Sequence, residues 1–339
     1  MINSDNKRIN WIDSIKGFGI ILVVLGHTSG IDIYLYKFIY SFHMPLFFIL
    51  SGYLWNYKKY RVFSFRDIFL KKFKLYILPY FFFAIVNLIL QILWRIIILR
   101  DMLSISEIYN YLFGILYCYA DVQHMPNCSP IWFLMCLFLS SILFWLLLKY
   151  FRKYALIISC MFALLSYAIY LFIDFRIPLN FSTALMAVLF MYLGLKLREL
   201  SILEKLVSKR IFVIFMIIIG VFLSQINDVV GMNENNYGYL LLFIITSIFL
   251  SVSFLFLFKN VDVLDNKIFN IFGRNTMLVI GFNYFIRDFS TEIYYLIPIL
   301  RDYEISSLVS FLFTIAIIFV MILLCEKTKR IIQKTMRGN

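Results

Sequence analysis

Residues 130–149, PIWFLMCLFLSSILFWLLLK, form an apolar run in which the single charged residue comes last. A helix rises about 1.5 Å per residue, so a run of about 20 apolar residues crosses the hydrocarbon core of a bilayer. The apolar residues follow one another without the alternation that marks a transmembrane strand. The run therefore predicts a helix that spans a membrane.

Nine further runs of this kind predict an all-α, polytopic transmembrane helical bundle of about ten spans. The chain has 339 residues, of which 63% are hydrophobic, 19% aromatic and 15% charged. A soluble domain has roughly 45–50% apolar and about 25% charged residues, and disordered chains are poor in aromatic residues, so both classes are excluded. The expected spans are 17–35, 39–57, 75–94, 130–149, 154–174, 179–197, 211–226, 239–258, 276–298 and 305–325.

The distribution of charge predicts how these spans are oriented. If both termini are cytoplasmic, the inner segments hold 26 of the 32 Lys and Arg residues and 8 of the 19 Asp and Glu residues. The inner side then carries +18 and the outer side −5, which together give the net charge of +13. Cytoplasmic loops carry the excess of Lys and Arg. The basic charge therefore indicates topology and contact with membrane lipid, and no nucleic acid is expected as a partner.

The shorter apolar segment 108–119 is expected to be a re-entrant or interfacial helix within an external loop at 95–129. If it crossed the membrane, every later basic loop would lie outside. The predicted organisation is a cytoplasmic N-terminal segment at 1–16, a transmembrane domain at 17–325 and a basic cytoplasmic tail at 326–339.

His27 falls inside the first expected span, and ionisable residues within spans are functional candidates. It follows Gly17 by ten residues, which places it about 15 Å into the membrane, near the centre. Lys16 and Asp13 lie on nearly the same helix face at the cytoplasmic edge. Because imidazole can accept a proton from a hydroxyl near pH 7, we predict His27 as catalytic. Lys16 and Asp13 are predicted to complete the catalytic set, with Asp13 orienting Lys16, and the alternative is that the pair only seals the cytoplasmic mouth. The alternative for His27 is an interhelical hydrogen bond.

Polar residues elsewhere in or near the spans are candidates for substrate binding. His43 begins the second expected span, where an interfacial or capping role is equally compatible, and Pro45 is expected to leave a backbone carbonyl free. Ser51 and Gly52 are expected to let another helix approach. For the remaining candidates the alternatives are a surface histidine, an interfacial tryptophan and interhelical hydrogen bonds. These candidates are His124, Trp132, Asn283, Tyr284 and Arg287.

The most basic inner segment is 58–74, just before the third expected span. Its cations serve topology and contact with anionic lipid, or they bind a polyanionic cytoplasmic cosubstrate, because phosphates pair well with Arg and Lys. The candidates for such binding are Arg66, Lys71, Lys72 and Lys74. No metal is expected, since no Cys or His residues have metal-site spacing. Cys118 and Cys128 are compatible with a disulfide or with two free thiols.

Five motifs in order along the chain resemble those of the acyltransferase 3 family of polytopic membrane O-acyltransferases, and the pattern is most similar to the fucose 4-O-acetylase-like branch. The first motif, RINWIDSIKGFGIILVVLGH at 8–27, places Lys16 eleven positions before His27. The others are FHMPLFFILSGYL at 42–54, KKFKLYILPY at 71–80, PIWFL at 130–134 and GRNTMLVIG at 273–281.

The resemblance implies an enzyme of the bacterial cytoplasmic (inner) membrane that takes an acetyl group from the cosubstrate acetyl-CoA and delivers it to a hydroxyl of a cell-surface or lipid-linked glycan. No tightly bound cofactor is expected. The resemblance implies that His27 is essential, that Lys16 is its partner position and that the Lys71–Lys74 region faces CoA. Asn283 departs from the family pattern, which often has a histidine there, and asparagine cannot act as a general base.

Two mechanisms and two rival functions are consistent with these residues. His27 either acts as a general base or forms a transient acyl-imidazole. A transporter or flippase for a glycan or lipid-linked sugar would use the same polar residues as a pathway, although no internal repeat supports it. The second rival is a glycan polymerase or a structural membrane subunit, and such a polymerase would be expected to have larger outer loops than those found here.

Overall fold

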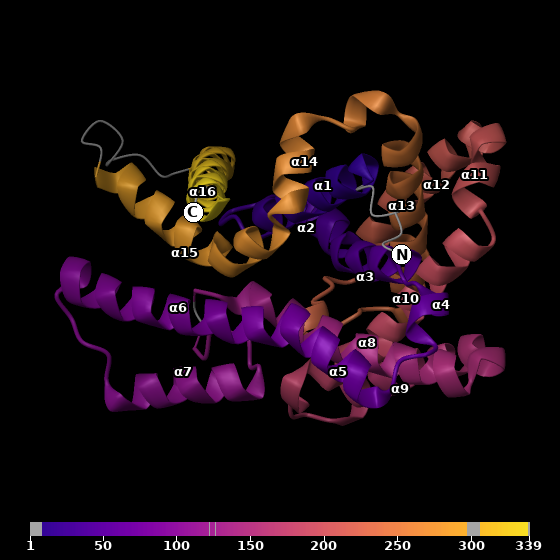
Figure 1. The fold of residues 1–339 in the computed structure, drawn as a ribbon, viewed down its shortest axis with the longest axis horizontal. Coiled ribbons are helices and arrows are strands. Elements are labelled where there is room, and N and C mark those ends of the chain that lie inside the picture. The colour runs from indigo at the N-terminus through magenta and orange to yellow at the C-terminus, as the bar shows by residue number, and fades with distance from the viewer. Residues whose placement is uncertain (1–8, 122, 126, 297–305, 338–339) are drawn as a thin grey trace. The chain divides into compact units, whose positions relative to one another are not determined.

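The computed structural model describes residues 9–121, 123–125, 127–296 and 306–337, and these form helices without any β-strand. The prediction of an all-α fold is confirmed, and Figure 1 follows the helices along the chain. The α-helices are α1 (Asn10–Gly26), α2 (Ile33–Tyr40), α3 (His43–Tyr53), α4 (Tyr57–Tyr60), α5 (Phe65–Lys72), α6 (Leu78–Trp94), α7 (Ile105–Tyr117), α8 (Trp132–Tyr150), α9 (Ala155–Phe172), α10 (Phe181–Glu199), α11 (Ile202–Lys205), α12 (Arg210–Ile226), α13 (Leu240–Asn260), α14 (Lys267–Arg274), α15 (Thr276–Leu296) and α16 (Ser307–Arg337). The π-helical segments are η1 (Phe73–Ile77) and η2 (Arg95–Leu99), and the 3₁₀ segments are η3 (Ser129–Ile131), η4 (Arg152–Tyr154), η5 (Pro178–Asn180), η6 (Leu206–Lys209), η7 (Met232–Glu234) and η8 (Asp262–Leu264).

Eight helical segments of the described chain are long and apolar enough to cross a membrane, so the chain is a multi-pass membrane protein. They correspond to eight of the ten expected spans. The other two expected spans contain α1, which has 17 residues, and α15, which carries Arg287, Asp288 and Glu292. These are the two helices with the predicted catalytic and buried polar residues. The eight segments are Ile33–Tyr53, Phe65–Ile98, Ser129–Tyr150, Arg152–Phe172, Pro178–Glu199, Ile202–Ile226, Leu240–Asn260 and Ser307–Gln333.

The chain divides into two compact units, which we describe separately. Unit 1 comprises Met1–Asp32 and Phe254–Asn339, and unit 2 comprises Ile33–Ser253. Unit 1 therefore contains α1, α14, α15, α16 and the last part of α13, and unit 2 contains α2 to α12 and the first part of α13. The predicted catalytic residues belong to unit 1, and the basic residues predicted to bind CoA belong to unit 2.

In unit 1, α1 and α14 approach each other backbone to backbone through two glycines. A Cβ atom on Gly17 would lie 1.9 Å from the carbonyl oxygen of Phe269, and one on Gly273 would lie 1.7 Å from that of Asp13. A side chain at either position would overlap backbone atoms, so only glycine permits this distance between the helices. The two glycines therefore fix the helix that ends at His27.

In unit 2, a second pair of glycines joins α3 to α10. A Cβ atom on Gly52 would lie 1.9 Å from the carbonyl oxygen of Met191, and one on Gly194 would lie 1.9 Å from that of Ile49. The predicted close approach of another helix at Ser51 and Gly52 is confirmed. Backbone packing of this kind gives dispersion contacts that a lipid chain cannot supply between the helices.

Pro45 lies in the first turn of α3 and has no N–H to donate to the carbonyl of Ser41. The prediction that Pro45 leaves a carbonyl free is confirmed. The hydroxyl of Ser247 on α13 donates a hydrogen bond of 2.7 Å to this carbonyl oxygen. The proline therefore creates an acceptor, and a neighbouring helix of the same unit satisfies it.

The expected single helix over 17–35 is wrong, because the chain leaves the helix after Gly26. Residues 27–32 form a turn in which Gly30 has a φ of 71°, and α2 begins at Ile33. A positive φ of this size favours glycine. The turn also contains threonine, serine and aspartate, whose short polar side chains favour turns over helix interiors.

The segment expected to be a non-spanning helix at 108–119 forms α7. It has 13 residues and a length of about 20 Å, which is too short to cross a bilayer. Ser104 and Glu107 form a capping box at its start, and it ends at Cys118, which has a left-handed φ of 59°. These signals at both ends define α7 as a short helix of its own.

The expected terminal segments are partly helical. Asn10–Lys16 belong to α1, and α16 continues into the expected tail as far as Arg337. Glu326, the first tail residue, accepts a hydrogen bond of 3.1 Å from the Asn275 amide and lies 3.6 Å from the guanidinium of Arg330. The described part of the tail therefore begins as a packed portion of unit 1.

Candidate active site at the end of the first helix

His27 caps the C-terminal end of α1. Its backbone N–H donates to the carbonyl oxygens of Val23 and Val24 at 3.2 and 3.3 Å, and its side chain is half-buried. The expectation that His27 lies within one continuous spanning helix is wrong, because α1 ends here and the turn at 27–32 follows. The imidazole therefore lies at a helix end, where carbonyl groups lose their helical partners.

Tyr284 of α15 contacts the imidazole directly. Its hydroxyl oxygen lies 3.1 Å from Nδ1 of His27, and the two ring centres are 4.9 Å apart in an edge-to-face arrangement. A tyrosine hydroxyl can donate or accept, so the contact is compatible with either imidazole tautomer. Sequence reasoning assigned Tyr284 to a substrate-binding wall, and the structure places it beside the predicted catalytic residue.

Arg287 lies one turn further along α15 and connects the two helices. Its guanidinium donates a hydrogen bond of 3.1 Å to the backbone carbonyl of His27 and lies 4.3 Å from the centre of the Tyr284 ring. It also donates to Asp288 at 2.7 and 2.9 Å. A cation at the C-terminal end of α1 is favoured by the helix dipole. Arg287 therefore positions His27 and adds positive charge beside it.

Asn283 precedes Tyr284 on α15 and is only 1% exposed. Its Nδ2 is buried without a hydrogen-bond partner. Leaving such a donor unsatisfied costs about 1–3 kcal/mol, and an oxygen atom of a ligand could satisfy it. Asn283 and Arg287 are four residues apart, so both lie on one face of the helix.

The other two predicted catalytic residues lie toward the opposite end of α1. Lys16 and Asp13 are about 16 and 21 Å from His27 along the helix axis. The carboxylate of Asp13 is buried and lies 3.4 Å from Nε of Arg274. Neither residue is within direct reach of the imidazole. Sequence reasoning missed Arg274 as a partner of Asp13, although the GRN motif contains it.

A cleft in unit 1 lies near this opposite end. Its volume is about 470 Å³, and it is formed by the start of α1, by α14 and by α16. Three cations and two carboxylates give the lining a small positive charge. They are Lys267, Arg274, Arg330, Asp265 and Glu326.

His43 is only 3% exposed, and its environment in unit 2 is structural. Nδ1 lies 2.8 Å from the carbonyl oxygen of Ile39, and the ring packs edge-to-face on Tyr40 at 4.9 Å. A carbonyl only accepts, so Nδ1 carries the proton and donates it to the broken end of α2. His43 therefore acts as a cap for a helix end, one of the two roles that its position predicts.

Lys72, predicted to bind CoA, is only 6% exposed. Its Nζ lies 4.8 Å from the ring centre of Trp55, 5.6 Å from that of Tyr60 and 5.4 Å from that of Tyr76. Aromatic faces attract an ammonium group and compensate for part of its lost hydration. Three rings therefore hold this cation inside unit 2.

The other three basic residues of this segment differ in exposure. Lys71 is half-buried, and its Nζ lies 5.0 Å from the ring centre of Tyr60 and 5.5 Å from that of Phe63. Arg66 and Lys74 are exposed. The four predicted CoA-binding residues therefore do not form one surface, since two cations are shielded by aromatic rings and two face outward.

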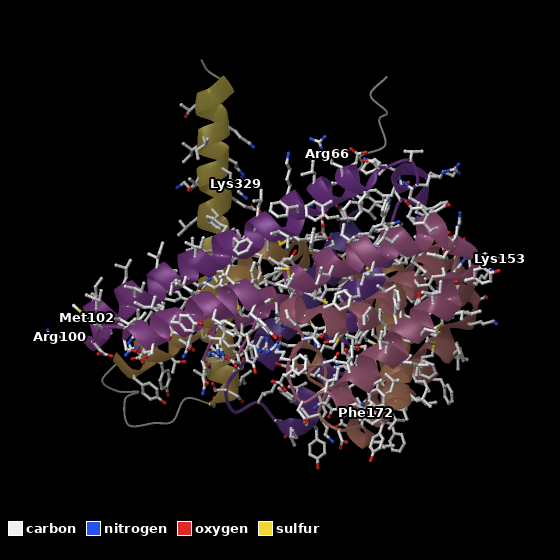
Figure 2. The ribbon with its side chains drawn as sticks, turned by 90° about the horizontal axis from the view of Figure 1, so that it is seen from below. Arg66, Arg100, Met102, Lys153, Phe172 and Lys329 are labelled. Carbon is white, nitrogen blue, oxygen red and sulfur yellow. The ribbon has the colours of Figure 1, made fainter. Side chains whose placement is uncertain are left out.

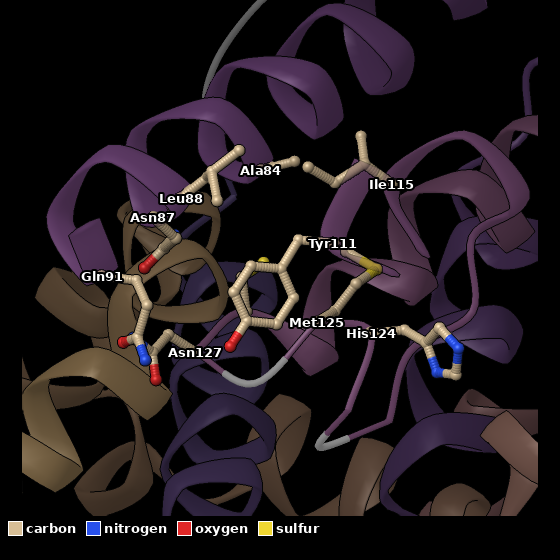
Figure 3. A pocket seen from close by; sticks show the side chains of 10 residues that line it. Ala84, Asn87, Leu88, Gln91, Tyr111, Ile115, His124, Met125 and Asn127 are labelled. Atoms are coloured by element: carbon tan, nitrogen blue, oxygen red, sulfur yellow. The ribbon is translucent and has the colours of Figure 1, made fainter. Parts of the chain in front are cut away.

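His124 and Trp132 lie in different surroundings. The imidazole of His124 lies 2.8 Å from the carboxylate of Asp121 and 4.5 Å from the ring of Tyr119. His124 also borders a pocket of about 20 Å³, room for one water molecule, in which the Gln91 and Asn127 amides meet beside Tyr111 (Figure 3). Trp132 is buried at the start of α8 and is not an exposed interfacial residue.

The two loop cysteines are free, buried thiols. Burial raises the pKa of Cys118 to about 11 and that of Cys128 to about 12. Both are therefore protonated at neutral pH and poorly reactive. Within the described part of the chain, no group of three His, Cys, Asp or Glu residues could hold a metal ion.

Comparisons with known proteins identify the family. One stretch of 59 residues is 48% identical to the nodulation protein NolL of Sinorhizobium fredii (strain NBRC 101917 / NGR234), and it covers 14% of this chain and 16% of NolL. No solved structure matches the chain. The model of a family described as an acyltransferase domain matches residues 9–326, nearly the whole chain. The protein therefore belongs to the acyltransferase 3 family and is a multi-pass membrane acyltransferase.

Proposed function

We propose that the protein is a membrane O-acetyltransferase that moves an acetyl group from cytoplasmic acetyl-CoA to a hydroxyl of a cell-surface or lipid-linked glycan. We place it in the bacterial cytoplasmic membrane with both termini inside. The observation that carries the proposal is the 3.1 Å contact between Nδ1 of His27 and the Tyr284 hydroxyl, next to Arg287. Membership of an acyltransferase family supports the reaction class, and the excess of inner Lys and Arg residues supports the orientation.

The Tyr284 contact suits a general base. When Nδ1–H donates to the Tyr284 oxygen, the lone pair lies on Nε2. Nε2 takes the proton of the acceptor hydroxyl while that oxygen attacks the thioester carbonyl. The tetrahedral intermediate then breaks its C–S bond, and the CoA sulfur leaves with the proton held by the imidazolium. The products are an acetyl ester and CoA thiol, so atoms and protons balance.

A second mechanism uses the same imidazole as a nucleophile. Nε2 attacks the thioester carbonyl, the C–S bond breaks, and CoA leaves as a thiolate. The glycan hydroxyl then attacks the acetyl-imidazole, the C–N bond breaks, and the hydroxyl proton passes to the thiolate, which leaves as CoA thiol. Both mechanisms develop negative charge on the thioester oxygen. Arg287 supplies nearby positive charge, and the buried Asn283 amide supplies an unused donor of the kind that stabilises an oxyanion. On this proposal Asn283 is a hydrogen-bond donor and need not act as a base.

Two basic regions are candidates for the phosphates of CoA. The exposed cations Arg66 and Lys74 in unit 2 suit direct contact with phosphate, whereas Lys71 and Lys72 are held by aromatic rings. The cleft near the start of α1 offers a second set, including Lys267 and Arg330. We propose that Arg66 and Lys74 bind the phosphates of CoA, and the family resemblance also favours this segment.

Acetyl transfer in membranes tests the proposal. Wild-type protein with radiolabelled acetyl-CoA is expected to label a glycan fraction, and His27→Ala is expected to lower the rate by about 10²–10⁴-fold. Full labelling by His27→Ala would rule out both proposed mechanisms.

Rapid quenching in the absence of acceptor separates the two mechanisms, because only the acyl-histidine route leaves label on the protein. Transport of a glycan across the membrane without acetyl labelling would favour the flippase function.

A further inference from the structure

A polar cleft of unit 2 lies where α9 ends and α10 begins. Its volume is about 430 Å³. Aromatic rings, carboxylates and amides from three separate segments form its walls. The residues that carry the inference are Tyr119, Asp121, Tyr170, Asp174, Arg176 and Glu234.

Arg176 holds the walls of this cleft together. Its guanidinium donates 2.7 Å to the backbone carbonyl of Asn233 and 3.3 Å to the side chain of Asn180, and it lies 4.8 Å from the ring centre of Tyr119. The amide of Asn233 in turn donates 2.7 Å to the carbonyl of Ala120. The three segments are therefore cross-linked, and the cleft is preformed.

A buried amide network supports the floor of the cleft. Asn235 is buried, its carbonyl oxygen accepts from Ser166 at 2.9 Å and from Tyr237 at 2.6 Å, and its amide donates 2.8 Å to the backbone of Ser166. Thr183 at the start of α10 donates 2.8 Å to the carbonyl of Met232. Satisfied buried networks of this kind hold binding walls in one arrangement.

The accessible polar and aromatic groups of the lining indicate the class of ligand. Arg176 contacts Asn180, Asn233 and the ring of Tyr119, so it holds the wall together, while its buried Nε is left as one unpaired donor. The exposed acceptors are the carboxylates of Asp174 and Glu234, beside the exposed ring of Tyr170. The carboxylate of Asp121 is already held by His124 and by backbone N–H groups. Such a surface suits a ligand with many O–H donors and an apolar face that can lie on an aromatic ring, and it repels anions. We infer that this cleft binds a neutral or amino-sugar segment of a saccharide.

The position of the cleft along the helices agrees with this ligand. The cleft lies at the C-terminal end of α9 and the N-terminal end of α10, whereas Lys153 precedes α9 and Lys196 lies in the last turn of α10. Lys153 and Phe172, at the two ends of α9, are labelled in Figure 2. The expected cytoplasmic side is therefore the other end of both helices. The cleft opens at the end where a glycan acceptor is expected.

This inference deepens the proposed function, since it names the class of acceptor, but it can be tested without turnover. Purified full-length protein in lipid nanodiscs is applied to an array of neutral, amino-sugar, uronic-acid and phosphorylated glycans. Tyr170→Ala is compared with Phe172→Ala, a matched control because Phe172 is an exposed aromatic residue on the same helix that does not line the cleft. Asp174→Asn with Glu234→Gln is compared with Asp228→Asn, an exposed carboxylate outside the cleft.

Wild type is expected to bind neutral or amino-sugar glycans, with affinity about tenfold lower in Tyr170→Ala and in the Asp174→Asn/Glu234→Gln variant and unchanged in both controls. His27→Ala is expected to bind as wild type does. Binding that is unaffected by the cleft variants, a preference for the acidic glycans, or no binding to any glycan would each overturn the inference. Binding at the cleft without acetyl transfer would retain the inference and reject the proposed function.

Discussion

His27 in unit 1 and His43 in unit 2 both lie beside an interrupted helix, yet their partners differ. His43 is buried and donates to the carbonyl of Ile39, an acceptor that fixes the proton on Nδ1. His27 is half-buried and faces the hydroxyl of Tyr284, which can donate or accept. An imidazole that exchanges a proton with a substrate must also be accessible to it, and half-buried His27 meets this requirement better than buried His43. The comparison therefore favours packing for His43 and supports the proposed chemistry for His27.

Replacing each histidine by asparagine tests the comparison most strongly. His27→Asn is expected to lower kcat by about 10²–10⁴-fold with little change in Tm, because it removes the base or nucleophile. His43→Asn is expected to lower the free energy of unfolding by about 1–2 kcal/mol and to leave kcat of the folded protein unchanged, because it removes a cap and packing. Acetyl transfer and thermal unfolding in the same nanodiscs measure both. Equal loss of kcat in the two variants would contradict the proposal that only His27 takes part in the reaction.

The glycine pairs provide the next test, because both units have one but only unit 1 links it to the histidine. Gly17→Ala and Gly52→Ala each place a Cβ 1.9 Å from a backbone oxygen, so each is expected to destabilise its unit by about 1–3 kcal/mol. Only Gly17→Ala is expected also to lower kcat of the folded protein, by about 10²-fold, since shifting α1 misplaces His27.

Gly231→Ala is the control for both glycine variants. A Cβ there would lie 3.4 Å from the nearest atom, a flexible glutamate side chain, and its φ of −135° suits any residue. Its Tm and kcat are expected to match wild type. A loss of kcat in Gly52→Ala as large as that in Gly17→Ala would show that the position of the catalytic histidine depends on both units.

The differences between these regions show which features the sequence predicts. Apolar runs and charge asymmetry predict an all-α membrane protein, because these depend on composition averaged over about 20 residues. The break after Gly26 depends on a few residues, Thr28, Ser29, Gly30 and Asp32, inside an otherwise apolar stretch, so the expected span runs through it. Ser–Gly followed by Asp was the local signal of this turn.

The site is less predictable, since its contacts join residues far apart in the chain. Tyr284 contacts His27 across 257 positions, and no periodicity within either helix predicts which residue of α15 faces the imidazole. Lys71 and Lys72 look alike in sequence to Lys74. The rings of Tyr60 and Phe63 reach them only because the chain turns between α4 and α5, and no local pattern predicts which lysines that turn covers. Polar residues within apolar runs could be identified as candidate site residues from the sequence. Only the tertiary contacts show which of them lie beside His27.

Removing the hydroxyl of Tyr284 sharpens the comparison between the two histidines. Tyr284→Phe keeps the ring against Arg287 and is expected to lower kcat about tenfold with KM for acetyl-CoA unchanged, the size expected for one hydrogen bond. Tyr295→Phe, an exposed tyrosine on the same helix, is the control. Wild-type kcat in Tyr284→Phe would mean that the hydroxyl contributes only to packing, as the carbonyl partner of His43 does.

Variants of the basic residues test whether acetyl-CoA is bound by unit 2 while His27 belongs to unit 1. Arg66→Gln with Lys74→Gln in unit 2 is expected to raise KM for acetyl-CoA about three- to tenfold with kcat unchanged, because exposed cations contribute uniform phosphate binding. Lys267→Gln with Arg330→Gln in the unit 1 cleft is expected to leave KM unchanged. The opposite result would assign donor binding to the same unit as His27.

The smallest expected effect compares a carboxylate of each unit. Asp13 in unit 1 is buried beside a cation, whereas Glu107 in unit 2 is only half-buried and accepts hydrogen bonds from Ser104 at the start of α7 and from Arg95. These bonds lower the pKa of Glu107 from 4.5 to about 2. A lowered pKa stabilises the fold above the unfolded value, and the stabilisation is lost as the pH falls from 4.5 toward 2. Glu107→Gln is therefore expected to lower Tm slightly at pH 7, and its difference from wild type should narrow below pH 4.5. A difference that stays constant from pH 7 to pH 3 would mean that the charge of Glu107 does not stabilise α7, and that its cap depends on hydrogen-bond geometry alone.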